Sequence, residues 1–335
     1  MIVVDEIHVC KSPTSQQGKN LLKLKAKYKL GMTGTLLLND PLDCFMPLKW
    51  LGIDRSTYTN FKYYYCNFGG PFGNQIMGYK NLDVLKDQLF RCSLRRTKDL
   101  LDLPEKTVIN EIVDMNESHK QFYENVKNGI IQQVDKVRMS TVNLLSMVGR
   151  LRQATVLPNI LTSENIEPSK ITRAVQLVEE IVANGNKVVV FSTFKDSAKY
   201  LFNLLLKYNP LLCTGDQKDN EINDSILKFQ NNDYNKVMIA TWQKMGTGVT
   251  LNKANYAIFL DTPWTDGVFE QAQDRIHRIG SKQPVFIYNL ICKDTIDERV
   301  KDIVNSKWAL SNYVIDDDTS DEVINSLKNY IKELQ

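Results

Sequence analysis

The sequence predicts an α/β protein of two lobes built on parallel sheets. Three observations support this class. The chain has 335 residues, which is enough for two domains of ordinary size. Short apolar runs rich in β-branched residues alternate with amphipathic stretches of helical period. A long helical stretch without strand signals separates two such regions, so we expect a helical insertion between the lobes.

Six apolar runs predict buried strands, and they span residues 2–4, 108–113, 188–191, 237–239, 256–260 and 285–290. Amphipathic stretches at residues 171–183 and 197–207 predict helices. Strands and helices that alternate in this way form parallel sheets through right-handed crossovers.

The segment 117–152 has a helical period and no proline, so it predicts a helical bridge. Pro158 and the turn formers of residues 162–170 predict a linker. We therefore expect a first lobe at 1–115, a helical bridge at 116–162, a second lobe at 163–312 and a peripheral tail at 313–335.

The composition excludes several classes of protein. No run of eighteen apolar residues could span a bilayer, and the N-terminus lacks the features of a signal peptide, which predicts a cytoplasmic protein. Six cysteines without C-x-x-C spacing predict neither a zinc site nor a disulfide framework. The net charge is only +3, so any basic surface must be local. Six lysines between Cys10 and Asn39 form either a solvated helix face or a phosphate-facing surface.

Asp5 and Glu6 follow the apolar run at residues 2–4 directly. The carboxyl end of a parallel strand is where a nucleotide hydrolase places an acid for Mg²⁺ and a second acid for the attacking water. Asp5 would bind the metal and Glu6 would act as the base. The alternative is that the two acids simply begin a loop.

A turn of small residues, Gly31 to Asn39, places Thr33 and Thr35 around Gly34. Hydroxyls and backbone amides on a tight turn can sense phosphate or bind the neighbouring acids. An ordinary β-turn is the alternative.

The segment 271–284 contains Arg275 and Arg278, which would share one face of a helix. Two guanidinium groups on one face suit polyphosphate oxygens and stabilise the charge on a transferred phosphoryl group. The alternative is a surface helix with ion pairs to Asp274 or Glu270.

Together these segments resemble the Snf-two type ATPases of helicase superfamily two, which translocate on double-stranded DNA. The matching segments are DEIH at Asp5 (motif II), TGT at Thr33 (motif III), LRRTKDLLDLPEK at Leu94, LRQ at Leu151, VVVFSTF at Val188 (motif IV), ATWQKMGTGVTL at Ala240 (motif V) and QAQDRIHRIG at Gln271 (motif VI).

The resemblance implies two RecA-like lobes with ATP and Mg²⁺ in the cleft between them and double-stranded DNA across both. Asp5 would bind Mg²⁺, Glu6 would be the general base, and His8 would link the ATP site to motif III. Arg275 and Arg278 would complete the site from the second lobe. The compact layout resembles that of microbial or viral members of the family. If the protein is viral, we expect it in the cytoplasm of the host cell.

The resemblance also implies contacts in the second lobe. Gly246 and Gly248 would let the motif V backbone approach the nucleotide. Thr193, Thr214 and Thr241 would contact DNA phosphates. Phosphate contacts carry no sequence readout, so DNA binding would be independent of sequence and sensitive to salt.

The 335 residues contain no G-x-x-x-x-G-K-[ST] loop to hold the phosphates of ATP. The only Gly-Lys pair is Gly18-Lys19, and Asn20 follows it. In this family the phosphate loop precedes motif II, so we expect a first lobe truncated at its N-terminus, completed by a missing or separately encoded N-terminal segment. We expect feeble ATP hydrolysis from the chain alone. The alternatives are a non-hydrolysing module that binds DNA or protein and, with less support, an RNA helicase.

Overall fold

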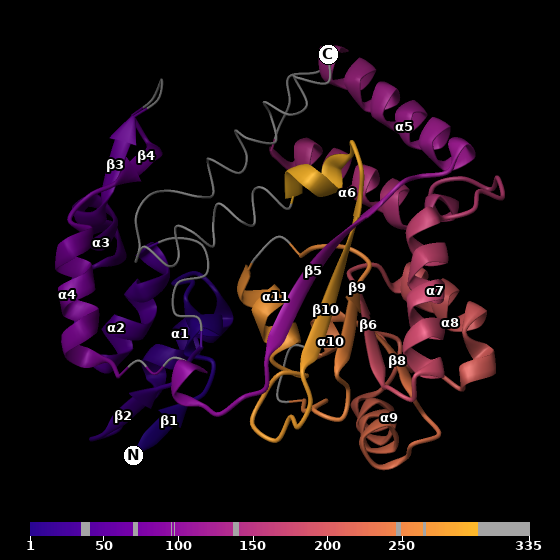
Figure 1. Ribbon diagram of the computed structural model, residues 1–335. Coiled ribbons are helices and arrows are strands. Elements are labelled where there is room, and N and C mark those ends of the chain that lie inside the picture. Colours follow the sequence, from indigo (N-terminus) through magenta and orange to yellow (C-terminus); the bar gives the residue numbers. More distant parts are fainter. Residues whose placement is uncertain are drawn as a thin grey trace. The chain divides into compact units, whose positions relative to one another are not determined.

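The computed structural model of the protein describes residues 1–34, 41–69, 73–94, 96, 98–136, 141–245, 249–263 and 266–300 (Figure 1). Two compact units divide these residues: the first contains residues 1–97 and 266–267, and the second contains residues 98–263 and 268–300. Both units combine helices with strands, and parallel pairing dominates, as the sequence predicts.

A six-stranded parallel sheet forms the centre of the second unit. In sheet order its strands are β5 (Lys106–Val113), β10 (Val285–Cys292), β9 (Tyr256–Phe259), β6 (Val188–Ser192), β8 (Val237–Thr241) and β7 (Leu211–Cys213). Figure 1 shows the first five of these side by side. Each of the five predicted strands of this region is present, and only the three-residue β7 was missed.

Both faces of this sheet are covered, because alternate residues of the central strands enter two different cores. Val188 and Val190 pack in one core, and Val189 and Phe191 pack in the other. The first core includes side chains of α7 (Ser169–Ala183) and α8 (Lys195–Leu204). The second core includes side chains of α9 (Asp219–Asn231), α10 (Trp242–Met245) and α11 (Asp266–Gln273).

Strand β5 pairs with β10 along its whole length, from Lys106 opposite Val285 to Val113 opposite Cys292. The predicted first lobe ended at residue 115, which lies beyond this strand. In the structure the sheet of the second unit therefore begins well before that boundary.

The predicted helical bridge consists of α5 (Glu117–Lys136) and α6 (Thr141–Val156). The two helices are joined to each other through the buried ring of His119, whose Nε2 lies 2.7 Å from the carbonyl oxygen of Ala154. The hydroxyl of Tyr123 accepts a hydrogen bond from the backbone of Ile296 at 2.9 Å. Both helices thus pack within the second unit. The predicted tail at 313–335 lies outside the described residues.

The first unit contains two small sheets and four α-helices in its described part. Strand β1 (Ile2–Val4) pairs in parallel with β2 (Lys29–Gly31), and β3 (Cys66–Gly69) pairs antiparallel with β4 (Gln75–Tyr79). The helices are α1 (Gln16–Lys23), α2 (Phe45–Leu51), α3 (Tyr58–Tyr65) and α4 (Leu82–Cys92). Across the described parts of both units, every helix is too short or too polar to cross a membrane.

The Gly18-Lys19 pair lies inside α1. Ser15 caps this helix through a hydrogen bond from the backbone N–H of Gly18 to its hydroxyl at 3.0 Å. A Cβ atom at Gly18 would lie 2.1 Å from the carbonyl oxygen of Ser12. Glycine is therefore required here by close packing of the backbone.

Candidate functional site

Asp5 and Glu6 lie at the carboxyl end of β1 in the first unit. The backbone N–H of Glu6 donates to Asp5 Oδ1 at 2.9 Å, which orients the Asp5 carboxylate. Glu6 has a left-handed backbone conformation, with φ 49° and ψ 46°. This conformation costs a residue with a Cβ atom about 1–2 kcal/mol, and such outliers concentrate at functional positions.

His8 lies between Glu6 of motif II and Thr33 of motif III. Its Nδ1 atom lies 2.7 Å from Thr33 Oγ1 and 3.2 Å from Glu6 Oε2. His8 is 8 % exposed, so its ring is largely shielded from water. A protonated ring would form an ion pair with Glu6, and a neutral ring can bond the threonine hydroxyl.

The pairing of β1 with β2 brings Thr33 to His8. The register places Val4 opposite Gly31, and the backbone N–H of Met32 donates to the carbonyl of Val4 at 2.8 Å. A Cβ atom at Gly31 would lie 2.7 Å from Ile7 Cδ1, so the glycine permits this close approach. Strand β2 was not predicted, because a three-residue strand beginning with lysine gives no periodic signal.

The other two predicted motif III residues, Gly34 and Thr35, have no described role in this arrangement. Gly34 is exposed, and a Cβ atom there would meet nothing within 4 Å, so packing does not require glycine at this position. Thr35 lies outside the described residues.

The residues at this strand end fit a hydrated Mg²⁺ ion. Mg²⁺ in nucleotide hydrolases is held by one or two carboxylates, with waters and substrate phosphates as its other ligands. Asp5 is exposed and uses only Oδ1 in its bond to Glu6. Among the described residues, no cluster of three or more His, Cys, Asp or Glu side chains forms a complete metal cage. Asp5 therefore suits a metal that arrives with its nucleotide.

The prediction that Arg275 and Arg278 share a helical face is wrong. Helix α11 ends at Gln273, and residues 274–280 form turns and a bend. Bonds between residues three apart, such as that from Arg275 N to the carbonyl of Ala272 at 3.2 Å, tighten the chain there. The exposed Arg278 side chain donates instead to Thr250 Oγ1 at 2.8 Å.

The segment before β5 packs against the residues next to Arg275. Lys98 forms an ion pair with Asp274, and Lys106 Nζ donates to Gln273 Oε1 at 2.9 Å. His277 Nε2 lies 2.7 Å from the carbonyl oxygen of Pro104. Burial lowers the pKa of Lys106, and the neighbouring Lys98 lowers it further. The turn that carries Arg275 is thus supported by residues 98–106 of the same unit.

A cavity of 540 Å³ lies at the carboxyl ends of the sheet strands in the second unit. Its lining includes Thr193, which follows β6, and Thr241, which ends β8. Lys195 and Lys244 also line it. The structure therefore brings two of the three predicted DNA-contacting threonines to one cavity, next to two cations that the sequence analysis missed. Their position directly after two neighbouring strands was the available signal.

The three threonines differ in what their hydroxyls can do. The Thr193 hydroxyl donates to Asp261, so it is already used within the protein. Thr214 is fully buried, and its hydroxyl donates to Gln217 Oε1 at 3.2 Å. The residue after it, Gly215, lines the cavity in its place. Gly246 and Gly248 lie outside the described residues.

Each cavity lysine already has a carboxylate partner. Lys195 Nζ is 2.8 Å from Asp216 Oδ1, and Lys199 Nζ is 2.5 Å from Asp216 Oδ2. Lys244 Nζ is 3.0 Å from Asp219 Oδ1. Hydrogen bonds from the two lysines lower the pKa of Asp216, and Asp216 in turn raises the pKa of Lys195. An incoming anion must therefore compete with these acids.

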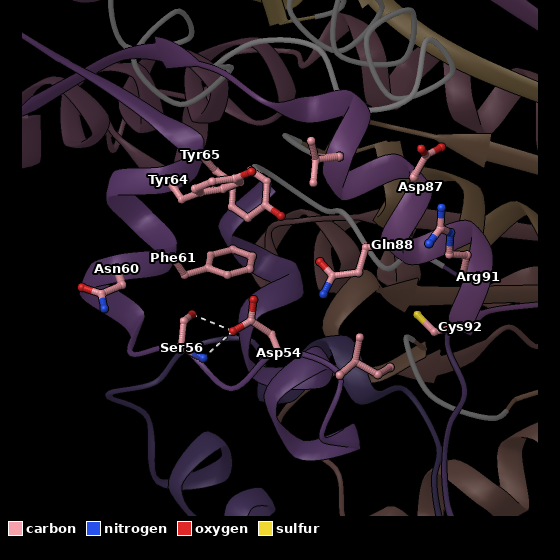
Figure 2. A pocket seen from close by; sticks show the side chains of 12 residues that line it. Asp54, Ser56, Asn60, Phe61, Tyr64, Tyr65, Asp87, Gln88, Arg91 and Cys92 are labelled. Atoms are coloured by element: carbon pink, nitrogen blue, oxygen red, sulfur yellow. Dashed lines mark hydrogen bonds between the residues drawn. The ribbon is translucent and has the colours of Figure 1, made fainter.

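A second cavity, of 680 Å³, lies between α3 and α4 in the first unit. Figure 2 shows the rings of Phe61, Tyr64 and Tyr65 on one side and Gln88 on the other, with Asp54 between them. Burial, with Tyr64 and Asp54 nearby, raises the pKa of Tyr65 to about 12, so its hydroxyl stays protonated. None of the predicted site residues lines this cavity.

Two family domains match the chain. Residues 1–160 match the SNF2-related domain, and residues 169–280 match the helicase conserved C-terminal domain. The chain therefore contains an SNF2-related domain and a helicase conserved C-terminal domain, as its motifs predicted.

Curated relatives match nearly the whole chain. An uncharacterized ATP-dependent helicase of Mycoplasma genitalium is 29% identical, and the match covers 95% of this chain and 31% of that protein. A putative ATP-dependent helicase/translocase of Bacillus subtilis is 27% identical, over 94% of this chain and 35% of that protein. The chain thus spans about a third of the length of these relatives.

Solved structures share the fold. The SWI2/SNF2 ATPase core of Sulfolobus solfataricus, solved in complex with dsDNA, superposes with a TM-score of 0.55 at 27% identity, covering 92% of this chain and 67% of that one. The C-terminal part of the Fun30 ATPase domain superposes with a TM-score of 0.57 at 21% identity, covering 70% of this chain and 100% of that one. The two units are accordingly RecA-like lobes.

Proposed function

We propose that the chain supplies the metal carboxylate, the general base, two arginines and part of the DNA-binding surface of an ATP-dependent double-stranded-DNA translocase. The observation that carries this proposal is the arrangement of Asp5, Glu6, His8 and Thr33 at the end of β1. Two adjacent acids at a strand end, one of them joined to a downstream threonine through a buried imidazole, suit a nucleotide hydrolase.

The proposed reaction is attack of water on the terminal phosphorus of ATP, with cleavage of the bond to ADP. Mg²⁺ bound through Asp5 would neutralise charge on the phosphates. Glu6 would take a proton from the attacking water. Arg275 and Arg278 would stabilise the charge that spreads over the transferred group. Because His8 contacts both Glu6 and Thr33, a change in the position of Glu6 during hydrolysis would be transmitted to motif III.

Duplex DNA would bind in part at the second-unit cavity, through its phosphates. Lys195 and Lys244 supply the charge, and Thr241 and the backbone at Gly215 supply hydrogen-bond donors. The relative from Sulfolobus solfataricus was solved with dsDNA, which supports this choice of nucleic acid. Contacts of this kind read the backbone, so affinity would be independent of sequence and would fall as salt rises.

Nucleotide binding tests the metal and base assignment. The 335 residues contain no G-x-x-x-x-G-K-[ST] motif, so we predict weak, Mg²⁺-dependent binding of a fluorescent ATP analogue and little hydrolysis. Asp5→Asn should abolish the Mg²⁺ dependence. Asp87→Asn, an exposed acid on α4, is the matched control and should leave it unchanged. A DNA-stimulated hydrolysis rate comparable to that of a full-length relative would contradict the prediction of weak activity.

The second candidate is a module that binds DNA without using nucleotide, and the lysines that line the second-unit cavity support it. The two candidates differ in one measurement, the affinity for duplex DNA with and without ATP and Mg²⁺. A translocase component predicts a nucleotide-dependent change in this affinity that Asp5→Asn removes. The binding module predicts one affinity under all these conditions. Tighter binding to duplex RNA than to duplex DNA would favour an RNA helicase instead.

A further inference from the structure

Asp261 is a buried carboxylate that holds the turn between β6 and α8. It follows the end of β9 and is 1 % exposed. Its oxygens accept the backbone N–H of Thr193 at 2.9 Å and the hydroxyl of Ser192 at 3.0 Å. The Thr193 hydroxyl donates to the same carboxylate. Three donors from two consecutive residues thus bind this turn to one acid.

Arg152 neutralises Asp261 from the bridge helix α6. Its guanidinium NH2 donates to Asp261 Oδ1 at 3.2 Å and to the carbonyl of Thr262 at 2.5 Å. The centre of the guanidinium lies 5.9 Å from the centroid of the Phe194 ring. Arg152 is 4 % exposed. One α6 side chain therefore touches both the end of β9 and the turn after β6.

A buried ion pair of this kind fixes geometry more than it adds stability. Removing two charges from water costs most of what their attraction returns, so such pairs are weak evidence for stability. The turn that Asp261 holds borders the 540 Å³ cavity, because Thr193 and Lys195 both line this cavity. The turn bound by Asp261 therefore also sets where the first cation of α8 lies.

We propose that Arg152 and Asp261 are positioning residues, which place Lys195 for phosphate binding and thereby couple the bridge helix α6 to DNA. This inference rests on the proposed function, because it needs the cavity to bind DNA phosphates. Coupling free energies are reciprocal, so a helix that sets DNA affinity must itself be stabilised when DNA binds.

A double-mutant cycle on the whole chain tests the proposal. The variants are Asp261→Asn, Lys195→Gln and Lys244→Gln, singly and combined, and the measurement is the affinity for a fluorescent DNA duplex. Each single variant should weaken binding. The loss of affinity in the Asp261→Asn, Lys195→Gln double variant should be smaller than the product of the two single losses by at least about threefold, because both substitutions act at one turn.

Lys244 is the matched control for this cycle. It lines the same cavity but comes from α10, whereas Asp261 bonds Ser192, Thr193 and Arg152. The Asp261→Asn and Lys244→Gln effects should therefore multiply. Multiplicative effects with both lysines would overturn the proposal. Failure of the unaltered chain to bind duplex DNA would instead refute the proposed function.

Hydrogen exchange separates this coupling from a merely structural role, because a structural role predicts no DNA-dependent change in the exchange of α6. Duplex DNA should slow amide exchange in α6 of the unaltered protein. Arg152→Lys keeps the charge and should retain much of this protection, whereas Arg152→Met should lose it. Arg173→Gln removes a different arginine that pairs with Glu111, and it should retain the protection. Equal protection of α6 in Arg152→Met would refute the coupling, and thermal melts of each variant identify any that fail to fold.

Discussion

Asp216→Asn is predicted to strengthen duplex DNA binding. The Asp216 carboxylate lies within 2.8 Å of Lys195 and 2.5 Å of Lys199, so one acid occupies two lysines beside the proposed phosphate site. Phosphate can use these lysines only by displacing Asp216. Asparagine has nearly the same shape and no charge, so the substitution removes the competitor and keeps the surface.

The structure also sets the size of this effect. All three side chains are between 42% and 47% exposed, so the solvent weakens their attraction. Exposed ion pairs change an equilibrium by at most about fivefold, and we expect a gain in affinity of about two- to fivefold. Each additional phosphate that a released lysine neutralises should steepen the slope of log K against log salt by about 0.9.

Fluorescence anisotropy with a labelled duplex, over about 50 to 200 mM salt, measures both quantities. Asp219→Asn, which releases Lys244, should act in the same direction. Glu179→Gln is the control, because it releases Lys207 from a comparable pair 2.7 Å long that does not line the cavity. The reasoning fails if Asp216→Asn weakens binding, or if Glu179→Gln steepens the salt slope equally.

Three further predictions concern stability and the first unit. Lys170→Met should lower the free energy of unfolding by about 3–5 kcal/mol in urea titrations, because it leaves Asp297 charged and buried without the ammonium 2.5 Å away; a loss below about 1 kcal/mol would contradict this. Burial lowers the pKa of His119 below 6.5, so the unfolded chain binds more protons and stability should fall as pH drops below about 6.5, but not in His119→Gln. Glu6→Gln should lower any measurable ATP hydrolysis by a factor of about 10² or more and leave duplex affinity without nucleotide unchanged.

The strands of the central sheet could be predicted because burial on both faces leaves a continuous apolar run. Residues 188–191 and 237–239 read this way in the sequence, and all of them are buried. Strands β2 and β7 have only three residues each, and neither showed a periodic pattern long enough to predict a strand. The β3–β4 hairpin contains glycines, which weaken a strand pattern.

The candidate site was predictable only where neighbouring residues define it. Asp5, Glu6 and His8 are adjacent in sequence, and one strand end places them together. The bond of Arg152 to Asp261 joins residues 109 apart, and no local pattern indicates it. The helix expected through Arg278 ends early for a similar reason. Contacts of Gln273 and Asp274 with residues 98–106 hold the chain in turns there.

The position of β5 leads to a last prediction, on where the second unit can be separated. Strand β5 forms eight residue pairs with β10, and it is the edge strand of the sheet. A protein that starts at residue 116 would lose β5 and leave the backbone groups of β10 without partners along an otherwise buried strand. Such an edge recruits other chains. We therefore expect residues 98–335 to be monomeric and cooperatively folded in light scattering and thermal melts, and residues 116–335 to aggregate. If both proteins are monomeric and melt cooperatively, β5 does not belong to this sheet in solution. Residues 98–106 would then not support the turn that carries Arg275 either.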